Sequence, residues 1–169
     1  MIQLQPVQPT DEERFRAIVE TYWQELMPHA DMMQDAERRN RYFQERFPLE
    51  NADRWVRWGM VEDEFVGFVA VALNLAKNQV MVEDFYVLPS ERRKGYGGAM
   101  VKALYQQLDE VGVELVELSV RRDNPQALAF WEAQGFRIAL YQLRQYRDPE
   151  MRVSFVGALS SDFIAEDSV

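Results

Sequence analysis

One stretch, residues 79–100 (QVMVEDFYVLPSERRKGYGGAM), constrains the fold more than any other part of the chain. Its first ten residues are rich in β-branched and aromatic side chains, which predicts a strand. Pro89 and Ser90 end that strand, because proline has no N–H group to donate to a neighbouring strand. Three glycines within four residues follow, and a helical pattern begins directly after them. The stretch therefore predicts a strand, a glycine-rich turn and a helix in immediate succession.

This strand–turn–helix order predicts a pocket for an anionic phosphate group. Glycines let the backbone approach a ligand closely, successive N–H groups converge there, and the helix dipole adds positive potential. Arg92, Arg93 and Lys94 place positive charge at the same point of an otherwise acidic chain. A solvated basic cluster is the simpler interpretation, but cations at a helix N-terminus oppose its dipole. A bound anion therefore explains them better.

Hydrophobic periodicity predicts the elements on either side of this stretch. Before it we expect a strand over 1–7, a helix from Thr10 to Pro28 begun by a Thr10–Glu13 capping box, a helical segment over 35–47, and a hairpin of strands 55–61 and 65–73 joined by residues 62–64. After it we expect a helix ended by Gly112, a strand over 113–120, a helix from Pro125 to Gly135, and strands over 136–146 and 151–159. These elements predict one α/β domain over residues 1–160, with a mixed and largely antiparallel sheet of about seven strands and about four helices. Residues 161–169 are expected to form an acidic tail.

Composition narrows the possible functions. The chain has no cysteine and a single histidine, His29, so we expect no disulfide, no cysteine nucleophile and no metal centre. We find no signal peptide and no apolar run of about 18 residues, so we expect a cytoplasmic protein that does not enter the membrane. The net charge of −9 argues against general nucleic-acid binding. The same charge would suit a cationic substrate, although an acidic surface that serves only solubility is the simpler interpretation.

Two motifs in this sequence resemble those of the GNAT superfamily of N-acetyltransferases. The first is Arg92-x-x-Gly95-x-Gly97, after a strand that ends in Tyr86-Val87-Leu88-Pro89. The second is Asn124-Pro-Gln-Ala127-x-x-Phe130-Trp131-x-x-x-Gly135-Phe136, and the order and separation of the two motifs also fit. The resemblance covers residues 65–136 well, and Glu83-Asp84-Phe85 is somewhat like the polyamine acetyltransferase branch.

The resemblance implies a GNAT-like fold and the transfer of acetyl from acetyl-CoA to an amine by direct attack on the thioester. It implies that the sheet splays at the cofactor site and that the pantetheine arm pairs with the exposed strand backbone. It also implies that the pyrophosphate lies on backbone N–H groups of the glycine turn, and that the Val87 N–H binds the thioester oxygen. The expected cofactor-binding residues are Phe85, Tyr86, Val87, Arg92, Arg93, Lys94, Gly95, Tyr96, Gly97, Gly98, Asn124 and Trp131.

Glu83 is the candidate catalytic base, acting through water on an amine whose pKa is about 10. A carboxylate inside an apolar strand is costly unless it is used or paired. In the polyamine branch that the chain resembles, a glutamate nine residues before the motif arginine is the proposed base, and Glu83 stands nine before Arg92. The alternative is a buried ion pair with an arginine from a neighbouring strand. Strand alternation would place Glu83 on one face with Phe85, and Asp84, which we expect to be structural, on the other.

Trp131 departs from the family pattern, because many members have a tyrosine there that protonates the CoA thiolate. Tryptophan cannot act as an acid at a useful pH, so solvent, Tyr141 or Tyr146 would have to supply that proton. Trp131 could instead pack against the cofactor arm or fill the core. Asn124 could bond to the cofactor, cap the helix that begins at Pro125, or do both.

The acceptor side is expected to come from the first helix, the segment 29–51 and the hairpin. A small cationic amine is the preferred acceptor, and a protein lysine or N-terminal amine is the first alternative. A non-catalytic acyl-CoA-binding module is the second alternative, because of Trp131, and the strand over 151–159 could pair across a homodimer interface. Candidates to line an acceptor pocket are His29, Asp31, Asp35, Trp55, Trp58, Glu62 and Asp63.

Overall fold

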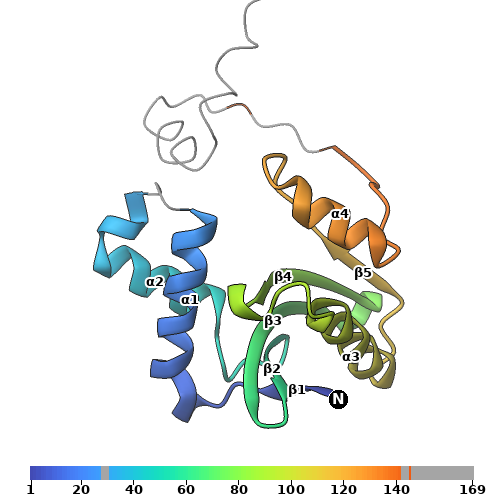
Figure 1. Cartoon of the computed structure of the whole chain (residues 1–169), viewed down its shortest axis with the longest axis horizontal. Coiled ribbons are helices and arrows are strands. Elements are labelled where there is room, and N and C mark those ends of the chain that lie inside the picture. The colour runs from blue at the N-terminus through green and yellow to red at the C-terminus, as the bar shows by residue number, and fades with distance from the viewer. Residues whose placement is uncertain (28–30, 142–144, 146–169) are drawn as a thin grey trace, which may run out of the picture. The chain divides into compact units, whose positions relative to one another are not determined.

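In a computed structural model of the protein (Figure 1), residues 1–27, 31–141 and 145 are described. The chain falls into two compact units. The first unit comprises residues 1–15 and 44–119. The second comprises residues 16–43 and the part of the chain from residue 120 onward. Among the described residues, no helix is both long and apolar enough to cross a bilayer.

The first unit is built on a five-stranded sheet in the order β1–β2–β3–β4–β5. The strands are β1 (Ile2–Pro6), β2 (Arg54–Val61), β3 (Glu64–Asn74), β4 (Gln79–Val87) and β5 (Leu115–Leu118). The strands from β1 to β4 pair antiparallel, whereas β5 pairs parallel to β4. The hairpin between β2 and β3 turns at Glu62 and Asp63, which have positive φ angles of 49° and 67°. Two-residue turns with positive φ at both positions have a backbone twist that matches that of the flanking strands.

Both faces of this sheet are covered within the first unit, since residues 66–71 of β3 are all buried. On one face the ring of Phe15 meets three other rings edge to face. Its centroid lies 5.2 Å from Phe47, 5.3 Å from Trp58 and 5.2 Å from Phe68. The other face is covered by α3 (Tyr96–Glu110), which contacts β1 and β4 (Figure 1). This packing places the N-terminus of α3 next to the end of β4.

The second unit consists of helical segments. α1 (Glu12–Leu26) belongs to it from Arg16, α2 (Ala36–Arg46) belongs to it up to Phe43, and α4 (Pro125–Ala133) lies wholly within it. The ring of Trp23 on α1 lies 5.1 Å from that of Tyr42 on α2, centroid to centroid. Four short 3₁₀ turns complete the described elements of the chain: Pro9–Asp11, Asp31–Gln34, Leu75–Lys77 and Pro89–Glu91.

The α/β class, the four helices, the hairpin and the strand–turn–helix order predicted from the sequence are confirmed. Gly112 and Gly135 follow α3 and α4 with φ angles of 76° and 96°, the left-handed conformation that ends helices. The prediction of one domain over residues 1–160 stays a prediction, and the expected tail over 161–169 lies outside the described residues.

The strand count is lower than expected, because the described residues form five strands rather than about seven. Residues 136–141 form no strand, and Ile138, Leu140 and Tyr141 are exposed. An alternating pattern gives a segment two faces, but a strand also needs a neighbour to bond its N–H and C=O groups. The strand expected over 151–159 lies outside the described residues.

The capping box predicted for the first helix is wrong. Helical geometry begins earlier, at Pro9, and the Gln8 N–H donates to Asp11 Oδ2 at 3.2 Å. Proline favours the first helical position because its fixed φ is already helical. The cap therefore falls on the residue before Pro9 rather than on Thr10.

Candidate active site

The glycine-rich turn joins the end of β4 to the N-terminus of α3. Arg93 and Gly95 both adopt left-handed backbone conformations there, with φ angles of 62° and 85°. Gly95 is the N-cap of α3, and its carbonyl accepts the Ala99 N–H at 3.1 Å, but it has no side chain to bond to the first turn. The N–H groups of residues 96–98 have no acceptor within the helix. Together with the helix dipole, these groups suit a phosphate.

The three cations of the turn lie in different surroundings. The Arg92 Nε donates to the Val87 carbonyl at 3.0 Å and so fixes the end of β4. The Lys94 Nζ lies 3.1 Å from Glu91 Oε2. The Arg93 side chain is exposed. The contacts of these cations with a phosphate stay predictions.

β4 is paired on both sides along its first half only. Its parallel pairing with β5 covers residues 79–82 and ends where Val82 faces Leu118. Its antiparallel pairing with β3 continues to Val87, which faces Gly67. Residues 83–87 therefore lie beyond the last pair with β5, and the splay implied by the family resemblance is confirmed.

The hydrogen bonds at the end of β4 fix the direction of the Val87 N–H. The Leu88 N–H donates to the Val66 carbonyl at 2.9 Å. The adjoining pair, Val87 and Gly67, is therefore one whose two residues exchange no hydrogen bonds with each other. The backbone groups of Val87 then point away from β3, toward the edge where β5 has ended. Phe85 lies two residues earlier, so its backbone groups point the same way.

A β-bulge lies within β4 at Glu83. Two successive residues of β3 face Asp84 and Val82, so Glu83 between them has no facing residue on β3. The alternation predicted for this strand persists in its burial, because Asp84 is buried with Val82 and Tyr86 whereas Glu83 and Phe85 are half-buried. The side chains of Glu83 and Asp84 nevertheless both reach one guanidinium group, that of Arg46.

Glu83 and Asp84 are held by two arginines. Arg46 Nε donates to Asp84 Oδ2 at 2.7 Å, and Arg46 Nη1 lies 3.3 Å from Glu83 Oε1. Arg54 Nη1 donates to the other oxygen, Glu83 Oε2, and Arg46 Nη2 donates to the Glu83 carbonyl at 2.6 Å. Asp84 is only 6% exposed, and a charge buried so far needs such partners. The structure thus pairs Glu83 with arginine, as the alternative expected, but the arginines come from α2 and β2 rather than from a strand next to β4. Sequence reasoning named neither of them.

The second motif lies in the second unit. Asn124 Oδ1 accepts the Ala127 N–H at 3.0 Å, so its predicted capping of α4 is confirmed. Trp131 is 7% exposed, and its ring lies 5.0 Å from that of Phe130 and 5.1 Å from that of Phe136. These contacts are the core packing expected as one role of Trp131. The contacts predicted for Asn124 and Trp131 with the cofactor stay predictions.

The structure does not support Tyr141 or Tyr146 as the acid that protonates the CoA thiolate. Tyr141 is 84% exposed, and Tyr146 lies outside the described residues. Just before the motif, Arg121 donates to Asp123 at 2.9 and 2.6 Å. These side-chain hydrogen bonds hold the pKa of Asp123 below its ordinary value.

Several residues that the sequence named as candidates to line the acceptor pocket have structural roles instead. His29 and the side chain of Asp31 lie outside the described part of the chain. Asp35 Oδ1 accepts two N–H groups of the first turn of α2 at 3.0 Å, and these hydrogen bonds lower its pKa. Glu62 and Asp63 form the hairpin turn.

The two candidate tryptophans are three residues apart on β2 and lie on opposite sides of the strand. Trp58 is buried in the ring cluster around Phe15. Trp55 lies under the guanidinium of Arg57, 4.8 Å from ring centroid to Cζ. Burial lowers the pKa of Arg57. Trp58 therefore belongs to the core, and Trp55 lies on the side of the sheet away from the ring cluster.

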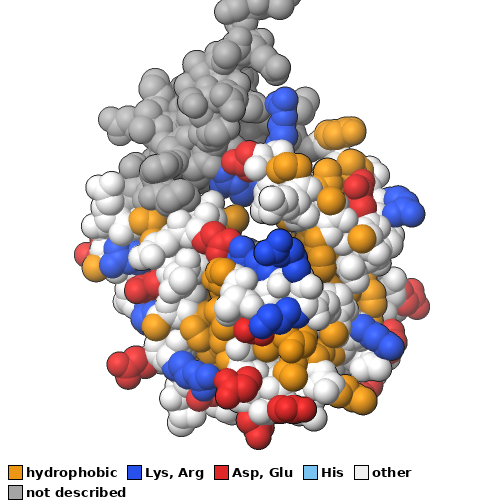
Figure 2. Space-filling view, viewed as in Figure 1, with side chains coloured by type: hydrophobic (Ala, Val, Ile, Leu, Met, Phe, Trp, Pro, Cys, Tyr) orange, Lys and Arg blue, Asp and Glu red, His pale blue; other side chains and the backbone are white. Residues whose placement is uncertain are grey.

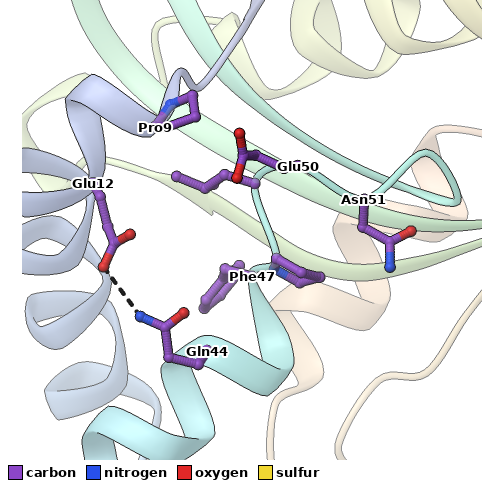
Figure 3. A pocket seen from close by; sticks show the side chains of 8 residues that line it. Pro9, Glu12, Gln44, Phe47, Glu50 and Asn51 are labelled. Carbon is purple, nitrogen blue, oxygen red and sulfur yellow. Dashed lines mark hydrogen bonds between the residues drawn. The ribbon is translucent and has the colours of Figure 1, made fainter.

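A hollow of about 350 Å³ lies between the start of α1, the end of α2 and the loop before β2. Two carboxylates line it, Glu12 from α1 and Glu50 from the loop, with the Phe47 ring beside them (Figure 3). Gln44 Nε2 donates to Glu12 Oε1 at 3.1 Å. The remaining lining residues are Pro9, Pro48, Leu49 and Asn51. Sequence reasoning pointed to this part of the chain but not to these residues, which carry no motif.

Known proteins share both the sequence pattern and the fold. A model of the acetyltransferase (GNAT) family matches residues 15–136, which include both motifs. The chain is 24% identical over 100 residues to the ribosomal protein bS18 alanine N-acetyltransferase of Escherichia coli, a match that covers 59% of this chain and 67% of that protein.

Two solved structures show the same fold. The PaiA N-acetyltransferase of Thermoplasma acidophilum, in complex with coenzyme A, has a TM-score of 0.63 and 16% identity over 82% of this chain and 91% of its own. An aminoglycoside acetyltransferase from an uncultured soil metagenomic sample, in complex with sisomicin, has a TM-score of 0.65 and 16% identity over 87% of this chain and 95% of its own.

Proposed function

Because the chain belongs to the GNAT acetyltransferase family, and is therefore an acetyl-CoA-dependent N-acetyltransferase, we propose that its acceptor is the primary amine of a small cationic molecule. The observation that carries this proposal is the hollow lined by Glu12 and Glu50. Its volume of about 350 Å³ is within the range of small-molecule sites, and two carboxylates favour an ammonium group. The apolar wall at Phe47 would accommodate a carbon chain.

The local charge of this hollow matters more than the net charge of the chain. On the face shown in Figure 2, basic and acidic side chains both occur among hydrophobic groups, so the net charge of −9 is not gathered there into one acidic surface. A surface of mixed sign attracts cations weakly at distances beyond the Debye length, about 8 Å at physiological salt. Recognition of a cationic acceptor therefore depends on carboxylates that contact it.

For the cofactor, we propose that the pyrophosphate is bound by the N–H groups of residues 96–98 and the pantetheine arm by the backbone of Phe85–Val87. The helix N-terminus without a side-chain cap supports the first contact. The end of the β4–β5 ladder at Val82 supports the second, because an extended ligand can add to the edge that β5 leaves. The residues present thus fit the cofactor that the family uses.

When bound, acetyl-CoA supplies the thioester carbonyl that a neutral amine attacks. We propose that the Val87 N–H binds the oxygen of that carbonyl as negative charge develops on it, since this N–H points to the open edge. Glu83 is the proposed acceptor of the ammonium proton, through a water molecule. Its ion pairs with Arg46 and Arg54 hold its carboxylate in one orientation.

The test is thiol release from acetyl-CoA with a panel of polyamines, aminoglycosides, amino acids and peptides. We expect the largest kcat/KM with a small polycationic amine, and mass spectrometry should show one added acetyl group. Glu50→Gln should raise KM for that amine about fivefold and leave KM for acetyl-CoA unchanged, because one carboxylate contact is lost. Glu110→Gln, at the exposed end of α3, makes the same change of charge and should leave both constants unchanged. Equal effects of the two substitutions would remove the hollow from acceptor binding.

The N-terminal amine of a protein is the second candidate acceptor. It is favoured by the similarity to an N-acetyltransferase that is named for the alanine of a ribosomal protein. A kcat/KM for alanine-initiated peptides above that for every small amine of the panel would replace the first proposal by this one.

A further inference from the structure

We propose that Arg46 is a positioning residue that keeps the edge of β4 open for the cofactor. Arg46 is the last residue of α2, and its guanidinium bonds to the bulge in β4. The bulge lies immediately before Phe85–Val87, where the proposed function places the pantetheine arm. The inference rests on that proposed cofactor site, but it makes a separate claim about why the site is open.

One guanidinium makes three contacts with the two residues of the bulge. Its Nε donates to Asp84 Oδ2 at 2.7 Å, and its Nη2 donates to the Glu83 carbonyl at 2.6 Å. Its Nη1 lies 3.3 Å from Glu83 Oε1. The guanidinium is planar and rigid, so three donors fix the relative positions of a backbone carbonyl and two carboxylates. A single change at Arg46 therefore removes these three contacts together.

The contact with the Glu83 carbonyl explains where the sheet opens. The pairing of β4 with β5 ends at Val82, the residue directly before the carbonyl that Arg46 holds. In a regular strand the backbone of the next residues would continue the ladder with β5. At the bulge this carbonyl is instead directed to Arg46, on the side where Arg46 also binds both carboxylates. Without Arg46, a regular β4 could continue its parallel ladder beyond Val82.

Arg54 provides a matched control, because it contacts the same carboxylate without contacting the backbone. Its Nη1 donates to Glu83 Oε2, and its side chain is 30% exposed, close to the 27% of Arg46. Removal of either arginine deletes one cation and one contact with the Glu83 side chain. Only removal of Arg46 also releases the Glu83 carbonyl and the Asp84 side chain.

The first measurement is amide hydrogen exchange of the protein without cofactor. If Arg46 keeps the edge open, Arg46→Ala should slow exchange of the Val87 N–H about tenfold, because new strand pairing would protect it. General destabilisation would do the opposite and speed exchange throughout the unit. Arg54→Ala should leave exchange at Val87 unchanged. Unchanged or faster exchange at Val87 in Arg46→Ala overturns the inference.

The second measurement compares the binding of CoA with that of 3′-phospho-ADP, which lacks the pantetheine arm. Arg46→Ala should weaken CoA binding about tenfold and leave the fragment within about twofold, whereas Arg54→Ala should affect neither by more than about twofold. Equal weakening of CoA and fragment overturns the inference. If the wild-type protein binds CoA no better than the fragment, the proposed pantetheine site fails, while hydrogen exchange still decides the role of Arg46.

Arg46→Lys covers the case in which Arg46→Ala does not fold. Lysine keeps the positive charge but has one compact ammonium group, which cannot reproduce the planar fork. We expect near wild-type thermal stability together with slowed exchange at Val87 and weaker CoA binding. Wild-type behaviour of this variant in both measurements would mean that charge alone suffices, and would overturn a role for the fork.

Discussion

The two halves of β4 share one pattern of burial but have opposite uses. Residues 79–82 lie between β3 and β5 and are hydrogen-bonded to both, whereas residues 83–87 are paired with β3 alone. Buried side chains alternate along both halves without a break, at Val80, Val82, Asp84 and Tyr86. The halves therefore keep the same alternation of buried side chains and differ in what their backbone groups bond to.

This difference shows how one strand can serve both the core and a ligand. The first half holds the sheet together with bonds on both edges. The second half keeps Asp84 and Tyr86 buried but leaves the backbone of Val87 directed at an edge without β5. A single extra residue, Glu83, separates the two uses, as β-bulges near functional sites often do.

The largest effect is expected at Gly67, which holds the second half of β4 against β3. A Cβ at this position would lie 2.1 Å from the Tyr86 carbonyl oxygen, so the two strands could not keep their spacing. Gly67→Ala should lower the free energy of unfolding by about 3 kcal/mol, the upper part of the range for overpacked sites. Urea unfolding followed by circular dichroism measures this loss.

Gly59→Ala is the control for this prediction, because Gly59 faces Gly67 across β2 and β3. A Cβ there would lie 2.8 Å from Met100 Sδ, near the end of a flexible side chain that can move. We expect a loss of about 1 kcal/mol. A loss at Gly59 equal to that at Gly67 would show that the close approach to β4 is not what makes Gly67 necessary.

The next effect, on kcat, concerns the Val87 N–H. This group lies in the half of β4 that pairs with β3 alone, residues 83–87, and not in the half that pairs on both sides, residues 79–82. Replacing Val87 by its α-hydroxy acid changes the amide to an ester and removes this N–H alone. We expect kcat to fall about a hundredfold, as for other lost oxyanion donors, with little change in the midpoint of unfolding because β3 does not use this N–H. The same replacement at Val82, in the paired half, should lower stability and leave kcat of the folded fraction nearly unchanged. The reverse result would exchange the roles assigned to the two halves.

The strand, the glycine turn and α3 could be predicted from sequence because local chemistry determines them. Pro89 ends a β-rich run, Gly95 adopts a left-handed φ, and Gly112 ends the helix at φ 76°. The bulge could not be predicted, because alternation continues through Glu83 and only the pairing with β3 reveals the extra residue. Its partner Arg46 lies 37 residues earlier, in a segment whose polar composition gives no sign of a buried contact.

The same limit applies to the acceptor side. Glu12, Gln44 and Glu50 come together only because the start of α1, the end of α2 and the following loop meet within the first unit. Each is an ordinary polar residue in its own segment, so spacing along the chain cannot single it out. In contrast, capping by Asn124 and the splay of the sheet were predicted correctly, because the first is local and the second follows from a family motif.

A smaller effect on turnover is expected from Glu83→Gln. We expect kcat to fall about tenfold and the acidic limb of the pH–rate profile to flatten. The fall in kcat is smaller than for a base that contacts its substrate directly, because Glu83 is proposed to act through water. Glutamine keeps the shape and one accepting oxygen, so the bulge should persist. An unchanged pH–rate profile would leave Glu83 with its ion pairs and no part in proton transfer.

The smallest effect is expected on the free energy of unfolding, from an ion pair that lies outside β4. It tests whether such a pair stabilises the fold as much as the pair that holds the bulge. Hydrogen bonds from Arg121 hold the pKa of Asp123 below its ordinary value, so this pair stabilises the fold above the pKa of the unfolded chain, about 3.9 for aspartate. That stabilisation is lost as the pH falls through the lower pKa of the folded state. Asp123→Asn should therefore cost less than about 1 kcal/mol at pH 7 and less again near pH 2. Asp84→Asn should cost more at pH 7, because Asp84 is 6% exposed and its partner Arg46 comes from a different element. Unfolding free energies of both variants at the two pH values would decide this, and equal losses at pH 7 would remove the special position given to the contacts that hold the bulge.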